Sequence, residues 1–98
     1  MLLKIHNSYR TVIAVCDTEL VGKFFEEGIR ILDVRETFYR GEEIEEKELV
    51  ELMIDQAKED ATFNIIGEKS TQAAIKAGLV REEGVGKVQN IPFALVLM

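Results

Sequence analysis

Residues 62–78 read TFNIIGEKSTQAAIKAG, a short apolar run followed by a glycine and then by a polar segment with three alanines. The apolar run at 62–66 predicts a strand. Residues 68–77 are predicted to form a helix that ends before Gly78, because glycine favours the left-handed C′ position. The alanines would let this helix approach a sheet closely. The stretch therefore predicts a strand, a turn at Gly67 and a helix packed back onto the sheet.

A second helix is predicted at residues 43–59 from the spacing of its apolar residues. Its apolar face should hold Leu49, Met53 and Ala57, flanked by Val50 and Ile54. Acidic residues occupy the other side of this helix. We therefore expect Leu49 and Met53 to be buried, and the exposed acids should include Glu45, Glu48 and Glu59.

The first sixteen residues predict a β-hairpin. Strands at 2–6 and 11–16 would be joined by a four-residue loop, so that His6 lies opposite Thr11. Asp17 then has the character of an N-cap for a short helix, because its carboxylate can accept backbone N–H groups of the first turn. Gly22 and Gly28 would keep that helix short.

Three further strands are predicted at residues 29–34, 87–91 and 93–97. Residues 35–41 are predicted to be a loop, and Pro92 is expected at a bend or an exposed edge. The order of elements predicts one domain over residues 1–98, of α/β class with mixed α+β character. We expect a single-layer mixed sheet with two main helices packed on it.

The charge of this chain is concentrated in one segment. The net charge is −6, and residues 42–60 hold nine acidic residues and two lysines, which leaves +1 for the remainder. A sequence-independent nucleic-acid binder usually carries a basic stripe, and this sequence shows none. No DNA partner is expected. The acidic helix is expected to be a solvated face, with a docking surface for a basic partner as the alternative.

Composition also predicts the cellular location. No apolar run approaches the roughly 20 residues that cross a bilayer, so no membrane partner is expected. The single Cys16 and the lack of an apolar signal core near the N-terminus predict a cytoplasmic protein. Fourteen glutamates against three asparagines and three glutamines are typical of a thermophilic source.

The residues Gly67-Glu68-Lys69-Ser70-Thr71 are similar to the end of a phosphate-binding loop. That motif requires glycine directly before the lysine, because backbone N–H groups there approach the phosphates closely. Glu68 occupies this place, and Phe63 stands where the leading glycine would be. We therefore predict a strand-to-helix turn and no cofactor, with a weaker anion site at the start of this helix as the alternative.

A nucleophilic Cys–His pair would have to use His6 and Cys16, the only residues of their kinds. In the predicted hairpin they lie five residues apart along one strand pair, which is roughly 16–17 Å. Such a pair needs hydrogen-bond contact at about 3 Å. Cys16 is therefore predicted to be a buried structural thiol, and His6 a surface residue at a strand end. One His and one Cys also predict no metal site.

Three carboxylates outside the acidic helix lie near apolar runs, namely Asp17, Asp33 and Glu36. Paired carboxylates perform acid–base chemistry when burial shifts their pKa values. The structural interpretation is that Asp17 caps a helix, Asp33 pairs with Arg35 on the same strand face, and Glu36 is solvated.

The segment 35–41 places two aromatic residues between two arginines. Such side chains are enriched at binding hot spots and stack on exposed bases. We expect Arg35, Tyr39 and Arg40 to be binding residues, with Tyr39 and Arg40 exposed and Phe38 buried as the anchor of the loop. The alternative is that Phe38 fills the core and Tyr39 partly covers it.

Several of these segments together resemble the archaeal family known as domain of unknown function 424. The matching residues are 15–23, 27–28, 32–35, Phe38, Tyr39, Gly41, 64–68, 74–80 and 91–92. The family pattern has a histidine after the proline, where this chain has Phe93. The resemblance implies an archaeal cytoplasmic protein with a connection to translation or RNA metabolism, and it implies no activity.

The sequence favours a small non-catalytic module that binds a protein partner. An RNA- or ribosome-associated module is the second hypothesis, and a small enzyme that uses Asp17, Asp33 and Glu36 is the third. The sequence leaves the ligand, the oligomeric state and the strand order open.

Overall fold

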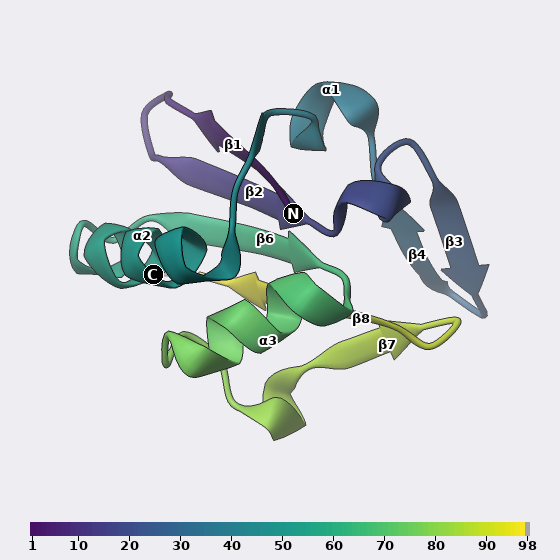
Figure 1. The fold of residues 1–98 in the computed structure, drawn as a ribbon. Helices are drawn as coiled ribbons and strands as arrows, with labels where there is room; N and C mark the ends of the chain where they lie inside the picture. Colours follow the sequence, from purple (N-terminus) through teal and green to yellow (C-terminus); the bar gives the residue numbers. More distant parts are fainter. Residues whose placement is uncertain (98) are drawn as a thin grey trace.

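The computed structural model describes residues 1–97, and its centre is a six-stranded sheet with the strand order β5-β1-β2-β6-β8-β7 (Figure 1). Most neighbouring strands are antiparallel, whereas β2 and β6 are parallel. The strands are β1 (Leu2–His6), β2 (Val12–Cys16), β5 (Glu42–Glu43), β6 (Thr62–Ile66), β7 (Gly86–Val88) and β8 (Ile91–Val96). The predicted α/β class, with a mixed sheet, is confirmed.

Two helices, α2 (Glu46–Lys58) and α3 (Glu68–Lys76), pack on one face of this sheet. Leu49 and Met53 of α2 are fully buried there, as predicted, in a cluster with Phe63 and Ile65 of β6. The acids expected at the surface are exposed, namely Glu45, Glu48 and Glu59. The buried Ala73 and Ala74 let α3 lie against the sheet.

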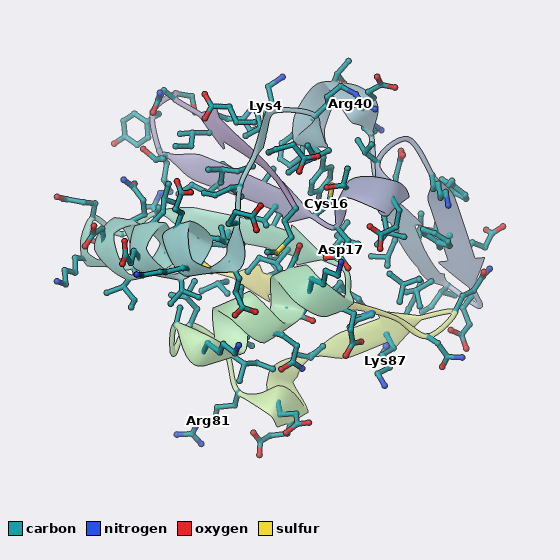
Figure 2. All side chains as sticks on the ribbon, viewed as in Figure 1. Lys4, Cys16, Asp17, Arg40, Arg81 and Lys87 are labelled. Atoms are coloured by element: carbon teal, nitrogen blue, oxygen red, sulfur yellow. The ribbon has the colours of Figure 1, made fainter. Side chains whose placement is uncertain are left out.

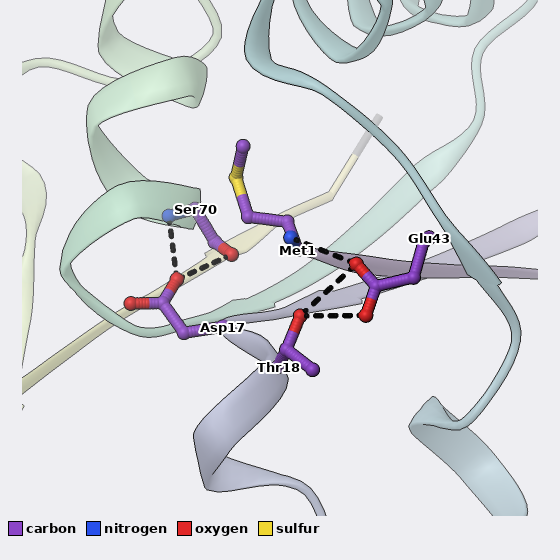
Figure 3. Close-up of polar contacts among 5 residues, drawn as sticks. All are labelled: Met1, Asp17, Thr18, Glu43 and Ser70. Atoms are coloured by element: carbon purple, nitrogen blue, oxygen red, sulfur yellow. Dashed lines mark hydrogen bonds and ion pairs between the residues drawn. The ribbon is translucent and has the colours of Figure 1, made fainter.

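The acidic helix begins later than predicted, at Glu46 instead of residue 43. Glu42 and Glu43 instead form the short edge strand β5, which pairs with Leu3 and Leu2 of β1. The Thr18 hydroxyl donates to the Glu43 carboxylate (Figure 3). These contacts with distant segments hold the backbone extended, although the glutamates themselves favour a helix.

A second layer covers part of the opposite face of the sheet. It consists of the 3₁₀ turn η1 (Thr18–Leu20), the hairpin of β3 (Phe24–Glu27) with β4 (Arg30–Asp33), and the short helix α1 (Glu36–Tyr39). A separate apolar cluster lies beneath these elements, with Leu32 and Val34 against Ile66 and Val88. The strand β3 was not predicted, and the predicted loop at 35–41 contains a helix.

Two turns differ from their predicted positions. His6 lies opposite Val12 instead of Thr11, so the loop of the first hairpin has five residues. Pro92 lies inside β8 opposite Lys87, and its carbonyl accepts a hydrogen bond from the Gly67 amide. The turn between β7 and β8 is formed by Gln89 and Asn90, both with positive φ. This is the pattern of a tight two-residue hairpin.

Within residues 1–97, no helix is long and apolar enough to cross a membrane.

The buried face of α2 provides a direct test of the fold. Met53→Ala is expected to lower the free energy of unfolding by about 2–4 kcal/mol, because a buried large side chain leaves a cavity. The neighbouring Ile54 is 40% exposed and is the matched control; Ile54→Ala should cost about 0.5 kcal/mol. Equilibrium urea denaturation measures both. Equal losses in the two variants would show that the helix is rotated from the described orientation.

Candidate functional site

The carboxylate of Asp17 is buried and accepts three hydrogen bonds. Asp17 precedes η1, as predicted, but its side chain makes no cap hydrogen bond to that turn. It accepts hydrogen bonds from the Ser70 amide and the Ser70 hydroxyl, each at 2.8 Å, and from the Lys69 amide at 3.1 Å (Figure 3). Asp17 therefore caps α3 and not the helix that follows it in sequence.

Gly67 is the residue that allows this contact. Its φ of 116° is a conformation that L side chains rarely adopt, and a Cβ there would overlap the Asp17 carboxylate. The Asp17 carboxylate thus occupies the N-terminus of α3, where a phosphate-binding loop would hold its anion. The predicted strand-to-helix turn is confirmed. Its glycine leaves space for the Asp17 carboxylate of the same chain.

Removal of the Asp17 cap should destabilise the protein strongly. Asp17→Ala is expected to cost about 1–3 kcal/mol, because two backbone amides and one hydroxyl lose their buried acceptor. Glu19, two residues away and exposed, is the control, and Glu19→Ala should cost under about 0.5 kcal/mol. Thermal and urea unfolding would measure the difference. A loss in Asp17→Ala no larger than in the control would mean that the cap contributes nothing.

Cys16 and His6 are separated, and each has a structural contact. Cys16 is fully buried, as predicted, and lies opposite Leu2. It is four residues along the strand from Val12, which lies opposite His6, so Cys16 and His6 are about 13 Å apart. Burial raises the pKa of the Cys16 thiol to about 11, and the Asp17 carboxylate adds to the rise. His6 is half-buried instead of exposed. Its ring stacks on Phe38 at 4.4 Å, and its Nε2 lies 2.8 Å from the Phe38 carbonyl oxygen.

The aromatic pair has the opposite burial from the one predicted. Tyr39 is the buried anchor, with 6% of its surface exposed, and Phe38 is half-buried under His6. The reason is that residues 36–39 form a helical turn, which points Tyr39 at the sheet and Phe38 toward β1. The alternative expectation placed both aromatics against the core with Phe38 as the more buried one, whereas Tyr39 is the more buried one in the structure.

Both arginines are exposed, which was predicted for Arg40, and each pairs with a carboxylate. Arg35 Nε donates to Asp33 Oδ2 at 2.9 Å, and Arg40 Nε donates to Glu36 Oε1 at 2.7 Å. The predicted Asp33–Arg35 pair is thus present. Figure 2 shows Arg40 on the outside of the molecule, whereas Cys16 and Asp17 lie between the elements.

Two adjoining hollows lie where β4 and α1 meet the sheet. The first, of about 340 Å³, is lined by Asp33, Arg35, Thr37, Phe38 and Tyr39. The second, of about 250 Å³, lies between β4 and the sheet, and it is lined by Ile31, Leu32, Asp33, Tyr39, Asn64, Ile65, Ile66, Phe93, Ala94 and Leu95. Asp33 and Tyr39 line both. We call the two together the β4 groove.

The β4 groove brings together two of the three predicted binding residues, Arg35 and Tyr39. Arg40 is not among its lining residues. Ile31 and Leu95, which are 55% and 56% exposed, were not predicted from the sequence. A signal was present, because Leu95 alternates with the buried Ala94 in a strand, which points it away from the helix face.

The family model described as a protein of unknown function (DUF424) matches residues 5–98. The chain belongs to this family. Among solved structures, it is similar to an uncharacterised conserved protein from Methanopyrus kandleri, with a TM-score of 0.85 and 28% identity over 98% of this chain and 90% of that one. No curated protein matches the chain. In this DUF424 chain, Phe93 stands where the resemblance places a histidine, and it lines the β4 groove.

The three candidate carboxylates of this DUF424 chain do not form a common site. Asp17 is held by α3, Asp33 by Arg35 and Glu36 by Arg40. In the described part of the chain, no group of three or more His, Cys, Asp or Glu residues could hold a metal ion.

The raised pKa of Tyr39 should make the stability of the protein depend on pH in the alkaline range. Burial raises its pKa to about 12 from a reference value of 10.0, and Cys16 and Asp33 add to the rise. The unfolded chain would lose this proton first, so the free energy of unfolding should fall as pH rises from about 10 to 12. Tyr39→Phe should show a smaller fall than the wild type, whereas the fully exposed Tyr9, changed to Phe, should not alter it. Denaturant unfolding across this pH range is the measurement, and identical slopes in all three proteins would contradict the prediction.

Proposed function

We propose that this DUF424 chain is a non-catalytic, cytoplasmic module that binds a segment of a partner protein in the β4 groove. The observation that carries the proposal is a partly apolar groove between β4, α1 and the sheet, with exposed large apolar side chains at its border. Ile31 and Leu95 face solvent across the groove, although large apolar side chains on a small domain are usually buried.

The size and lining of the groove suit a short segment of another chain. The two hollows lie within or near the range of about 300–1,000 Å³ that is common for ligand sites. The apolar lining is interrupted by the side chains of Asn64, Asp33 and Arg35. A few polar groups in an apolar hollow fix the orientation of a ligand.

The charges favour protein over RNA at this surface. Affinity for RNA depends on cations that are available to phosphates. Arg35 already pairs with Asp33, and Arg40 with Glu36, so each cation is offset by an adjacent carboxylate. A partner with little net charge is therefore the better match.

The enzyme hypothesis has less support from the geometry. Asp17, Asp33 and Glu36 each have a different cationic or amide partner, and no pair of them shares one. General acid–base catalysis needs a carboxyl group within reach of the substrate and of its catalytic partner.

The proposal is tested with peptides selected from a random heptapeptide library displayed on phage. The strongest peptides should shift the backbone amide NMR signals of Ile31, Asp33 and Leu95. Leu95→Lys should weaken their binding at least about tenfold, because it replaces an apolar side chain of the groove with a charged one. Ile54→Lys, at a comparably exposed apolar residue on the opposite face, should leave the affinity unchanged.

Two results would contradict the proposal. One is a selection whose peptides leave the groove signals unchanged or bind equally to Leu95→Lys. The other is a single-stranded RNA 12-mer that shifts the groove signals where peptides do not, with an affinity that falls steeply with salt.

A further inference from the structure

The strand β4 has one paired edge and one free edge, and the register identifies the residues on each. β4 pairs with β3 alone, with Leu32 opposite Phe25 and Arg30 opposite Glu27. Just beyond the strand, the Val34 amide donates to the Lys23 carbonyl at 2.9 Å. In an antiparallel pair, hydrogen-bonded residues alternate along each strand. The backbone groups of residues 30, 32 and 34 therefore point toward β3.

It follows that the N–H and C=O groups of Ile31 and Asp33 point to the other edge of β4. Among the described residues, no strand pairs with this edge. Four backbone hydrogen-bonding groups are thus aligned at strand spacing along one line. Such an unpaired edge is a template for a further strand.

The outer edge of β3 differs, because another part of the chain occupies it. The Gln89 side chain donates to the Glu26 carbonyl at 2.8 Å, and the Gln89 amide donates to the Glu27 carboxylate at 2.7 Å. These bonds join the tips of the two hairpins, which Figure 1 shows side by side. Only the β4 edge of this small sheet is left for an external strand.

The free edge runs along the β4 groove. Ile31 and Asp33, whose backbone groups face outward, both line the hollow above the sheet. Asn64 and Leu95 form the floor of that hollow, and Arg35 and Thr37 continue it past the end of β4. A strand laid beside β4 would therefore fill the groove and cover the exposed floor.

We propose that the partner segment binds as an added β-strand on the free edge of β4, and this inference rests on the proposed function above. Ile31 and Asp33 each donate one backbone hydrogen bond to the segment and accept one from it. The residue opposite Leu32 points down to the sheet, because paired residues share a face and Leu32 is buried. Its neighbours point outward with Ile31 and Asp33.

The chemistry of the partner follows from this geometry. The downward position contacts Leu95 and Phe93, so it carries an apolar side chain. The Asp33–Arg35 pair is internally neutral, which matches an uncharged segment better than a polyanion or a basic peptide. The occupant is thus an extended, uncharged peptide with apolar residues at alternate positions, the recognition mode in which backbone bonds give affinity and pockets give specificity.

Amide hydrogen exchange of the intact chain tests the pairing directly, with a groove-binding heptapeptide from the selection above as the probe. In the free protein the amides of Ile31 and Asp33 should exchange rapidly, because no strand covers them. Saturating peptide should slow both at least about tenfold. The amide of Glu26, which faces the opposite edge, should not change.

A proline pair provides the second measurement. Ile31→Pro removes an outward N–H without breaking a bond to β3, and it should weaken peptide binding at least about tenfold. Glu26→Pro is the matched control, because Glu26 is paired with Ile31 and its own N–H also faces outward. It should bind as the wild type does. If Ile31→Pro fails to fold, the exchange rates of the wild type decide the question.

The outcomes separate the two proposals. A peptide that occupies the groove while the Ile31 and Asp33 amides exchange as in the free protein overturns strand addition and leaves the proposed function standing. Wild-type affinity in folded Ile31→Pro has the same meaning. A selection in which no peptide perturbs Leu95 overturns both.

Discussion

The bond network around Asp17 holds the sheet and one of its covering helices in register. Asp17 follows the end of β2, and its carboxylate binds the first turn of α3, which follows β6. The Asp17 amide also donates to the Ile66 carbonyl at 3.0 Å, so backbone and side chain bind the same strand–helix turn. A carboxylate at a helix N-terminus is favoured by both the free amides and the helix dipole. The parallel pair and α3 therefore depend on one buried group.

The sequence predicted the parts of the structure that depend on local patterns. The strand, Gly67 and α3 follow one another within 17 residues, and the buried Leu49 and Met53 of α2 follow from helical periodicity alone. Asp17 was correctly assigned as a cap, but to the wrong helix. Its partner Ser70 lies 53 residues away, and a propensity for capping carries no information about such distances.

The groove could be predicted only in part, for the same reason. Arg35 and Tyr39 were identified from residue type, but the β4 groove exists because β4 crosses above Asn64 and Leu95, which are remote in sequence. Tyr39 is buried in place of Phe38 because residues 36–39 form a single turn of helix. A sequence of four residues specifies such a turn only weakly. The strand β3 has the sequence Phe-Phe-Glu-Glu, which lacks the alternation that identifies a half-buried strand.

The parallel pair of β2 and β6 has a consequence for how this fold can change. Parallel neighbours need a long crossover, and here that crossover contains the whole second layer, from η1 to α1, followed by β5 and α2. The cost of closing a loop grows only slowly with its length. The turns of the second layer can therefore change in length, provided that Leu32 and Val34 still cover Ile66 and Val88 of the sheet. The surface formed by α1 and β4 can therefore evolve largely independently of the sheet and helices that support it.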